Sequence, residues 1–431
     1  MSETPRPPRT SGSNALAERI IRCSDGLQDE LIAFRRDMHS HPELARGEKR
    51  ATEAVARRLR AAGLRVALLP GTGLYCDIDA STTSTTGSTG STGSAAGAGG
   101  RVVLRADLDA LPLLETSGLE FAATNGYAHA CGHDIHTASA LGAGLILAEL
   151  AAAGELARDV RLVFQPAEEV QPGGALDVIE VGALDGVSEV YALHCDPRVD
   201  VGAVATRVGP ITSTSDTVTV TLTSRGGHTS RPHRTGDLVY ALGQIITAAP
   251  AVLARRIDPR FGVNLTWGSV HAGTAANAIP ARGTVTGTLR CLDSRAWDEA
   301  DDLLMSIIPQ LVAAIGVHAE VDLVRGVPAV VNTAREVDVL EASVRTLVGE
   351  DATDLTDQSL GGEDFGWYLR HRPGAMGRLG TRSAGGRTYD LHQGDAIFDE
   401  GAIGVGARVL AGVAALPRAG RTRYPEPVRD S

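Results

Sequence analysis

The fold is decided by residues 101–207, which open with RVVLRADLD (101–109) and alternate between strand and helix patterns. The predicted elements are an apolar strand at 101–106, a helix at Thr137–Ala153, the strand DVRLVFQP (159–166), a helical stretch at 174–182 and the strand SEVYALH (188–194). Apolar strands that alternate with helices predict an open α/β sheet. Ligands of such sheets bind beyond the carboxyl ends of the strands, so we expect the functional residues there.

Upstream of this stretch, the pattern predicts three helices and one strand. The apolar positions indicate a helix through Leu16 and Ile21, a second helix at Leu27–Met38 that ends before Pro42, and a third at Ala51–Ala62. A strand at 74–79 then precedes the low-complexity segment STTSTTGSTGSTGSAAGAGG, residues 81–100. We interpret this segment as a solvated hairpin loop between the strands at 74–79 and 101–106.

Residues 216–326 follow a different order, β-α-β-β-α-β, which is typical of a separate two-layer split-βαβ domain. Two apolar helices, Val337–Val348 and Ile403–Leu416, follow without a complete sheet of their own. We therefore predict a catalytic α/β domain of residues 14–210 and 327–416, interrupted by an inserted domain of residues 211–326. Residues 1–13 and 417–431 are rich in Pro, Arg and Ser and are expected to be flexible tails.

The composition excludes several classes of protein. Hydrophobic residues at 43% and charged residues at 22% of the 431 positions are globular values. A net charge of −11 argues against a nucleic-acid or anionic-membrane surface and favours a small-molecule substrate. The start has no apolar signal segment and no stretch approaches 18 uninterrupted apolar residues, so we expect a cytoplasmic protein without a membrane span.

The first candidate metal ligands lie in HACGHDIH, residues 129–136, between a strand and a helix. A thiolate and an imidazole two residues apart, Cys131 and His133, can reach one ion from a loop. Nitrogen and sulfur ligands suit Zn²⁺, and Co²⁺, Ni²⁺ or Mn²⁺ are alternatives. The ordinary alternative is a loop with a buried cysteine and surface histidines.

Further donors follow the later strands. Glu168 and Glu169 come directly after DVRLVFQP, His194 ends SEVYALH, and His392 lies near the carboxyl end of the chain. Adjacent glutamates diverge, so one can bind metal while the other takes a proton from a water molecule. Five donors are too many for one tetrahedral ion with an open position and suit two bridged ions. Taken singly, however, the Glu pair is typical of a solvated helix start, and each histidine of a satisfied core residue.

Two glycine-containing motifs carry candidate functional residues that are not metal ligands. In GGHTS (226–230), two glycines let His228 approach a substrate and stabilise an oxyanion, although a polar turn has the same pattern. In GGEDF (361–365), Glu363 either orients a metal-bound histidine or places an acid at a helix start.

These motifs, in this order, resemble the aminoacylase-like metallo-amidohydrolases, in the branch with hippurate hydrolases, auxin-conjugate hydrolases and N-acyl-amino-acid deacylases. The resemblance runs from about Leu27 to Leu416. The matching segments are RRDMHSHPEL (35–44), RADLDALP (105–112), HACGHDIHTA (129–138), FQPAEE (164–169), LHCDP (193–197), GGHTSRPH (226–233), NAIPARGTVTGTLR (277–290), GGEDF (361–365) and LH (391–392). The resemblance implies a zinc-peptidase-like open mixed sheet flanked by helices, with an inserted ferredoxin-like lid and dimerisation domain.

The resemblance also implies a role for each motif residue. Two divalent ions, Zn²⁺ or Mn²⁺ by expectation, are held by a ligand set in which the Cys131 thiolate bridges. Glu168 is the implied general base, and His228 acts on the substrate. The implied ligands are Cys131, His133, Glu169, His194 and His392; the implied supporting residues are Asp107 and Glu363, and the implied substrate contacts are Asn277 and Arg290.

The function that follows is a metal-dependent hydrolase of N-acyl amino acids or related amides, which releases a carboxylic acid and an amino acid. A dipeptidase or metallocarboxypeptidase with the same metal centre is the first alternative, and a non-catalytic binding relative is the second. Related enzymes use such lids to dimerise, so we expect a homodimer that pairs through exposed strands at 216–224 and 261–270.

Overall fold

Four parallel strands form the centre of the larger sheet. The computed structural model describes residues 11–80, 100–418 and 423–424. Its eight-stranded mixed sheet has the order β1-β2-β4-β3-β5-β16-β6-β15, in which β4, β3, β5 and β16 are parallel neighbours. The strands are β1 (Arg65–Leu68), β2 (Leu74–Ile78), β3 (Arg101–Asp107), β4 (Val160–Gln165), β5 (Val187–Asp200), β6 (Val204–Thr206), β15 (Thr353–Leu355) and β16 (Gly374–Arg382).

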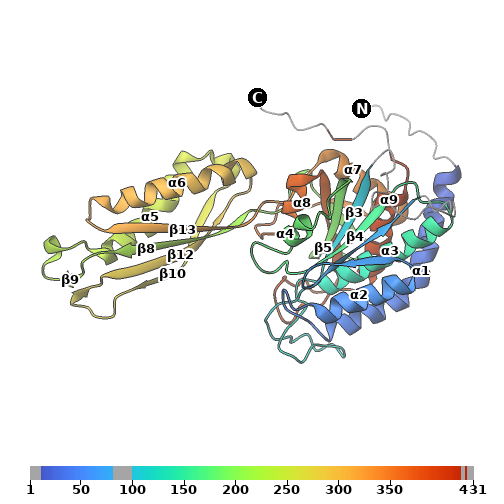
Figure 1. The fold of residues 1–431 in the computed structure, drawn as a ribbon, viewed down its shortest axis with the longest axis horizontal. Helices are drawn as coiled ribbons and strands as arrows, with labels where there is room; N and C mark the ends of the chain where they lie inside the picture. The colour runs from blue at the N-terminus through green and yellow to red at the C-terminus, as the bar shows by residue number, and fades with distance from the viewer. Residues whose placement is uncertain (1–10, 81–99, 419–422, 425–431) are drawn as a thin grey trace. The chain divides into compact units, whose positions relative to one another are not determined.

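The chain divides into two units (Figure 1). Unit 1 comprises Met1–Gly209, Val331–Asp357 and Trp367–Ser431, and unit 2 comprises Pro210–Val330 and Gln358–Gly366. Unit 1 contains the eight-stranded sheet. The short strands β7 (Gly209–Pro210) and β14 (Val331–Asn332) pair with each other.

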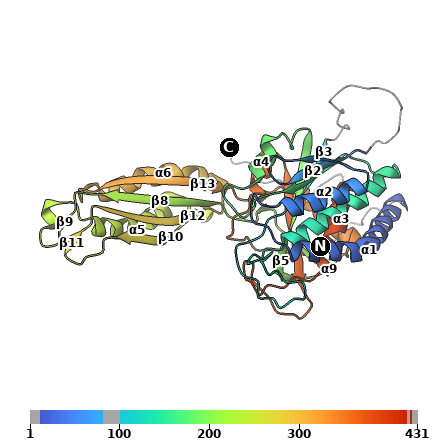
Figure 2. The same ribbon diagram turned by 60° about the horizontal axis from the view of Figure 1, so that its bottom comes forward.

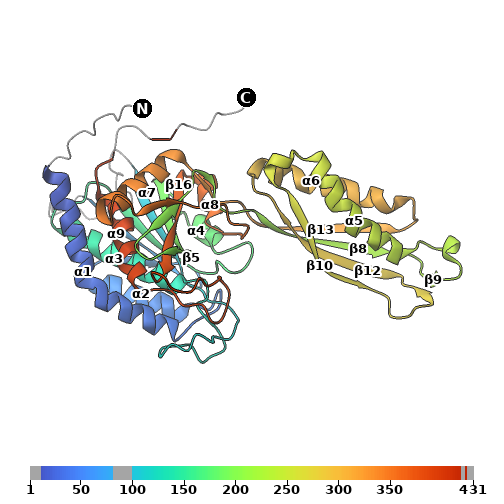
Figure 3. The same cartoon turned by 180° about the vertical axis from the view of Figure 1, so that it is seen from behind.

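Helices cover both faces of the sheet of unit 1, which makes a three-layer α/β fold. Figure 2 shows α2, α3 and α1 on one side of β2 and β3, and α4 on the other side. Helix α3 is apolar on every side because it packs against both α1 and α9, and Figure 3 shows α7 and α9 beside β16. The helices are α1 (Ser11–His39), α2 (Lys49–Ala61), α3 (His133–Ala152), α4 (Ala175–Glu180), α7 (Ala334–Leu347), α8 (Gly366–His371) and α9 (Gly401–Ala415).

The expected hairpin between the strands at 74–79 and 101–106 is wrong. Strand β2 pairs antiparallel with β4, and β4 pairs parallel with β3, so β4 lies between the two strands that were expected to pair. The side chains of Leu74, Cys76 and Ile78 in β2 are buried in the core, on a strand that contacts helices α2 and α3. Residues 81–99, the segment interpreted as a loop, lie outside the described residues.

The first two expected helices are one continuous helix, α1 (Ser11–His39). Of the expected tails, residues 1–10, 419–422 and 425–431 lie outside the described residues. The described part of the carboxyl-terminal segment makes specific contacts: Arg418 pairs with the buried Glu189, and Tyr424 donates a hydrogen bond to Glu341 Oε1 over 2.6 Å.

Unit 2 is a four-stranded antiparallel sheet with two helices. The strands are β8 (Ser215–Thr223), β10 (Asn264–Ala272), β12 (Arg282–Arg290) and β13 (His318–Val327), and the helices are α5 (Leu238–Arg256) and α6 (Ser294–Ala313). Val218, Val220 and Leu222 of β8 are buried, whereas the alternate threonines are half-buried, as the period of two predicts. The β-α-β-β-α-β order is the one predicted from the sequence.

The sheet order of unit 2 corrects one expectation about its edges. The order is β10-β12-β8-β13, so β8, which contains residues 216–223, is a central strand. The exposed edges are β10 and β13. A dimer that extends this sheet therefore has to pair through one of those two strands.

Two helices, α3 and α5, are long and apolar enough to cross a membrane by length and composition alone. The relevant window of α3 is 83% buried, which is typical of the core helix of a globular unit. Helix α5 packs against α6, β10 and β12. Length and composition thus do not distinguish these helices from ordinary packed ones.

Candidate metal centre

The candidate ligands of unit 1 lie at one edge of the sheet. Strand β3 ends at Asp107, which is paired with Gln165 at the end of β4, and the neighbouring β5 carries His194 beyond the last residue that it pairs with β3. Because these strands are parallel, their carboxyl ends meet at the same edge. Helix α3 begins there with His133.

Gly132 lies between two candidate ligands, Cys131 and His133, and its conformation shapes the turn that carries them. Gly132 has a φ of 88° and precedes the first residue of α3. A β-carbon at this position would lie 2.7 Å from Cys195 Sγ, so a side chain does not fit. The turn brings Cys131 Sγ to 3.5 Å from His194 Nε2.

Two histidines are held in the same tautomer by backbone carbonyls. His133 Nδ1 donates to the carbonyl of Asp109 over 2.8 Å, and His194 Nδ1 donates to the carbonyl of Cys195 over 2.8 Å. In the neutral form, each ring therefore presents the lone pair of Nε2, which is the form that binds metal. His133 Nε2 is buried and has no hydrogen-bond partner among the described residues.

The glutamate pair is aimed by a buried carboxylate. Asp109 accepts the backbone N–H of Glu168 through Oδ1 (3.0 Å) and that of Glu169 through Oδ2 (2.9 Å). Glu169 Oε1 lies 3.8 Å from His133 Nε2 and 3.3 Å from His392 Nε2, yet it is buried without a hydrogen bond among the described residues. Glu168 Oε2 lies 3.9 Å from His133 Nε2.

His392 reaches the same place from the loop between β16 and α9. It has a φ of 61°, and its backbone N–H donates to the carbonyl of Ala130 over 2.9 Å. Its side chain is 51% exposed, in contrast to the buried His133 and His194. The hydrogen bond to Ala130 ties this distant loop to the segment that carries Cys131.

The five donors form two groups that share Cys131, and each group could hold a cation. Cys131, His133 and His194 form one group whose ligand atoms lie within 4.8 Å of one another, and Cys131, Glu169 and His392 form another. Cys131 belongs to both groups, as a bridging thiolate requires. Among the described residues, His133 Nε2 and Glu169 Oε1 are buried without hydrogen bonds, and a bound ion would give each of them a partner.

The pKa shifts of two donors, Cys131 and His194, agree with this interpretation. Burial lowers the pKa of His133, but Asp107 and other neighbours raise it well above its usual range, so a cation would have to displace a proton there. Burial raises the pKa of the Cys131 thiol well above its usual range, so the thiolate needs a bound cation. Burial also lowers the pKa of His194 well below its usual range, which keeps its imidazole neutral and able to bind metal.

A chain of hydrogen bonds through Arg105, Asp107 and His136 lies next to the candidate ligands. Asp107 Oδ1 accepts a hydrogen bond from His136 Nδ1 over 2.6 Å, and Asp107 Oδ2 accepts one from Arg105 Nη1 over 2.7 Å. His136 Nε2 accepts the backbone N–H of Cys195 over 2.8 Å, beside His194. Burial alone would raise the pKa of Asp107, but the nearby His133, His136 and Arg105 hold it well below its usual range.

Sequence reasoning assigned no role to His136 or Asp109. A signal was present for each: His136 is three residues after His133 and therefore on the same side of the helix, and Asp109 follows Asp107 at the end of a strand. Their hydrogen bonds to Cys195, Glu168 and Glu169 could only be seen in the structure.

The other predicted site residues lie in unit 2. His228 is exposed in β9 (Gly227–His228), which pairs with β11 (Ala278–Ile279). Its Nδ1 accepts the backbone N–H of Ser230 over 3.1 Å, which leaves the proton on Nε2. Asn277 is next to it, because the Asn277 carbonyl accepts the N–H of Thr229 over 3.2 Å.

Arg290 and Glu363 are positioned by backbone contacts within unit 2. Arg290 Nη1 donates to the carbonyl of Leu360 over 2.8 Å, and burial lowers the pKa of Arg290. Glu363 is buried and accepts the N–H of Phe365 over 2.9 Å. The roles of these two residues and of His228 and Asn277 in catalysis stay predictions.

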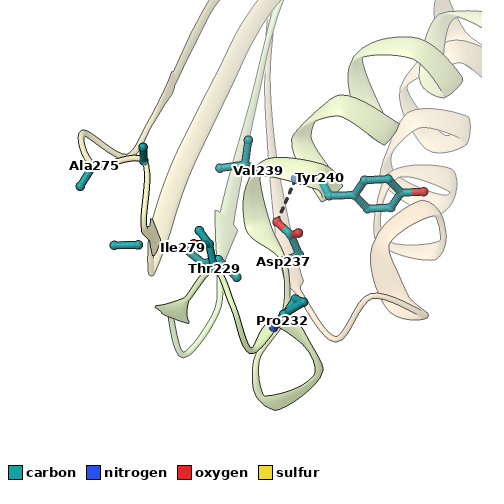
Figure 4. Close-up of a pocket in the computed structure, with 9 residues that line it drawn as sticks. Thr229, Pro232, Asp237, Val239, Tyr240, Ala275 and Ile279 are labelled. Atoms are coloured by element: carbon teal, nitrogen blue, oxygen red, sulfur yellow. Dashed lines mark hydrogen bonds between the residues drawn. The ribbon is translucent and has the colours of Figure 1, made fainter.

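A pocket lined by Thr229, the residue after His228, opens at the start of α5 (Figure 4). Asp237 accepts the N–H of Tyr240 and caps that helix, and Tyr240 points away from the cap. The pocket is lined by Thr229, Pro232, Asp237, Val239, Tyr240, Ala275, Ala276, Ala278 and Ile279.

Comparison with known proteins identifies a family and several relatives. The model of peptidase family M20/M25/M40 matches residues 103–416. N-acetyl-L-cysteine deacetylase of Bacillus subtilis (strain 168) is 33% identical over 381 residues, which cover 88% of this chain and 85% of the relative. Thermostable carboxypeptidase 2 of Saccharolobus solfataricus is 35% identical over 401 residues, which cover 91% of this chain and 96% of the relative.

One relative is about twice as long as the matching region. A putative glutamate–cysteine ligase 2-3 of Rhodococcus jostii is 45% identical over 391 residues, and the chain spans 47% of its length. Among solved structures, a Bacillus subtilis protein described as a dinuclear metal-binding peptidase of the M20 family has a TM-score of 0.76 and 30% identity, with coverage of 91% of this chain and 98% of that chain.

Proposed function

Because the chain belongs to peptidase family M20/M25/M40, we propose that it is a metal-dependent amidohydrolase that cleaves N-acyl amino acids or related amides. The observation that carries the proposal is the pair of donor groups that share Cys131 at the carboxyl ends of β3, β4 and β5. The products are a carboxylic acid and a free amino acid. Zn²⁺ or Mn²⁺ is the proposed metal, with Co²⁺ or Ni²⁺ as alternatives, and two ions are bound per chain.

In this proposal, each residue has one task. Cys131, His133, Glu169, His194 and His392 hold the ions, which when bound supply Lewis-acid activation of water and of the scissile carbonyl. Glu168 accepts the proton of the attacking water and returns it to the leaving nitrogen. The Nε2–H of His228 donates to the carbonyl oxygen as negative charge develops on it.

The glutamate pair provides the experiment that tests these roles. Glu168→Gln should keep both metal ions and lose about 10²–10⁴-fold in kcat, because proton transfer is removed while the ligands stay. Glu169→Gln should instead lower metal content. Glu180→Gln, at an exposed position of α4, is the matched control and should behave as the wild type. Equal metal loss in both site variants would contradict the division of roles.

The alternative functions separate by substrate. The carboxypeptidase names among the relatives favour peptides as the second candidate substrate class. N-acetyl, N-benzoyl and dipeptide substrates assayed side by side with defined added metal distinguish the two classes. A binding relative without catalysis would bind metal and cleave none of them.

N-acetyl-L-cysteine is the substrate to assay first. Two relatives are named N-acetylcysteine deacetylases, and the relative with 45% identity is named for a ligase that uses cysteine. A deacetylase of this kind would release the free cysteine that such a ligase consumes. Turnover of N-acetylalanine at the same kcat/KM as N-acetylcysteine would contradict this preference.

We propose a homodimer in the cytoplasm as the working form of the protein. Strands β10 and β13 of unit 2 present unpaired edges that a second copy can cover. Light scattering at micromolar concentration checks the assembly, and the mass of one chain, 44.8 kDa, would contradict it.

A further inference from the structure

A buried carboxylate in the segment before α2 contacts the loop that carries the glutamate pair. Glu48 is fully buried, and its Oε1 accepts the backbone N–H of Ala167 over 2.8 Å. Ala167 directly precedes Glu168 and Glu169. The two partners are 119 positions apart in the sequence.

Ala167 has a backbone conformation that alanine avoids. Its φ is 57°, in the left-handed region, where a β-carbon crowds the following carbonyl. The described residues include only two other non-glycine positions with positive φ, Arg46 and His392. Such conformations persist where the surroundings hold them and are concentrated at functional sites.

Glu48 holds two of these three residues with one oxygen. Its Oε1 accepts the backbone N–H of Arg46 over 2.9 Å as well as that of Ala167. Its Oε2 accepts a hydrogen bond from the Thr72 hydroxyl over 2.6 Å, which fixes the rotation of the carboxylate. Together with Asp109, which accepts the N–H groups of Glu168 and Glu169, Glu48 binds three consecutive backbone amides of the loop.

Helix capping does not account for the buried Glu48 carboxylate. Glu48 is the N-cap residue of α2, but its side chain makes no capping hydrogen bond. Glu43 serves the first turn instead, because its carboxylate accepts the N–H groups of Arg50 (3.0 Å) and Ala51 (2.9 Å). The Glu48 carboxylate is therefore directed to the loop and not to its own helix.

We propose that Glu48 is a positioning residue of the metal centre, which holds Ala167 in its left-handed conformation and thereby aims Glu168 and Glu169. The inference rests on the proposed roles of that glutamate pair. Without the clamp, Ala167 relaxes toward negative φ, and the two side chains that follow it change direction. Both proton transfer and metal binding should then weaken together.

The test combines a loss of the clamp with a relief of the strain. Glu48→Ala should lower kcat and the affinity for Zn²⁺ each by about 10–100-fold, the range for partners that orient metal ligands, with little change in KM. Glu48→Gln keeps an acceptor oxygen and should stay within about threefold of the wild type. If the alanine variant does not fold, Glu48→Met, which keeps the volume without an acceptor, replaces it.

The decisive variant is Glu48→Ala combined with Ala167→Gly. Glycine adopts positive φ without a steric penalty, so this second change should recover about tenfold of the lost kcat and Zn²⁺ affinity. A purely structural role of Glu48 predicts no such recovery. Ala167→Gly alone should remain within about threefold of the wild type, because the clamp is still in place.

Glu43→Ala is the matched control, since it removes a carboxylate from the same helix start without touching the loop. It should lower the melting temperature without changing Zn²⁺ affinity. The proposal is overturned if Glu43→Ala weakens Zn²⁺ binding as much as Glu48→Ala does, or if Ala167→Gly recovers nothing. Zn²⁺ affinity is read by calorimetry on metal-free protein, so a wild type that cleaves no amide would refute the proposed function and leave this test intact.

Discussion

Replacing Asp107 by asparagine should damage the metal centre although Asp107 is not among the proposed ligands. The side chain is fully buried, and its two oxygens accept hydrogen bonds from His136 Nδ1 and Arg105 Nη1. Asparagine keeps the shape but has one acceptor oxygen and one NH₂ donor. If the oxygen stays with Arg105, the NH₂ group faces His136.

His136 cannot resolve this conflict by changing its tautomer. A proton moved from Nδ1 to Nε2 would let Nδ1 accept from the new NH₂ group. It would also set Nε2–H against the backbone N–H of Cys195, which Nε2 accepts at 2.8 Å in the wild type. Either arrangement leaves one buried donor unsatisfied, and the second does so next to His194.

The magnitude follows from these contacts. An unsatisfied buried donor costs about 1–3 kcal/mol. Removing the charge of a buried ion pair costs about 3–5 kcal/mol, and the hydrogen bond from Arg105 to Gln165 Oε1 places the effect at the lower end. We therefore expect Asp107→Asn to lower the free energy of unfolding by about 3 kcal/mol and the Zn²⁺ affinity by about 10–100-fold.

The assay is urea unfolding of metal-free protein together with calorimetric Zn²⁺ titration. Asp77→Asn is the matched control: Asp77 lies on the same sheet and pairs with Arg161 at 2.6 and 2.7 Å, but its side chain is 31% exposed and touches no histidine of the centre. Arg161 is buried, but Asp77 is partly exposed and asparagine keeps one oxygen for Arg161, so the change should cost only about 1–2 kcal/mol. If Asp107→Asn costs no more than this control and leaves Zn²⁺ affinity unchanged, the argument from His136 and Arg105 is refuted.

Three further outcomes are expected. Cys131→Ser keeps the shape of the side chain and should lower the metal content, as measured by elemental analysis. An unchanged metal content would show that Cys131 is not a ligand. Gly132→Ala adds a β-carbon at positive φ, 2.7 Å from Cys195 Sγ, and should lower both metal content and the free energy of unfolding, the latter by about 2–4 kcal/mol in urea unfolding; a stable variant with full metal would contradict the crowding. His228→Ala should lower kcat by about 10²–10³ at full metal content and nearly unchanged KM, whereas normal kcat with a lower melting temperature would reduce His228 to a turn residue.

The sequence was sufficient for elements whose signal is local. Strands such as β4 and β8 are recognisable because apolar runs and alternation with a period of two reflect burial on the faces of a sheet. The donors Cys131, His133 and Glu169 stand out because so many ligand side chains occur in two short motifs. The same local patterns located most helices of both units to within a few residues, but they divided α1 in two and missed the short helix α8.

The sequence by itself thus determined most helices, the strands with strong apolar patterns, and the side chains that are candidates for chemistry. It did not predict the strands β1, β6, β15 and β16. Only the tertiary structure decided that β4 lies between β2 and β3, that β8 is central, and that His392 meets Glu169. It alone showed that Glu48 holds Ala167. These facts depend on contacts between residues that are far apart in the chain. Periodicity and composition indicate only whether a residue is buried, and they do not indicate which distant partner buries it.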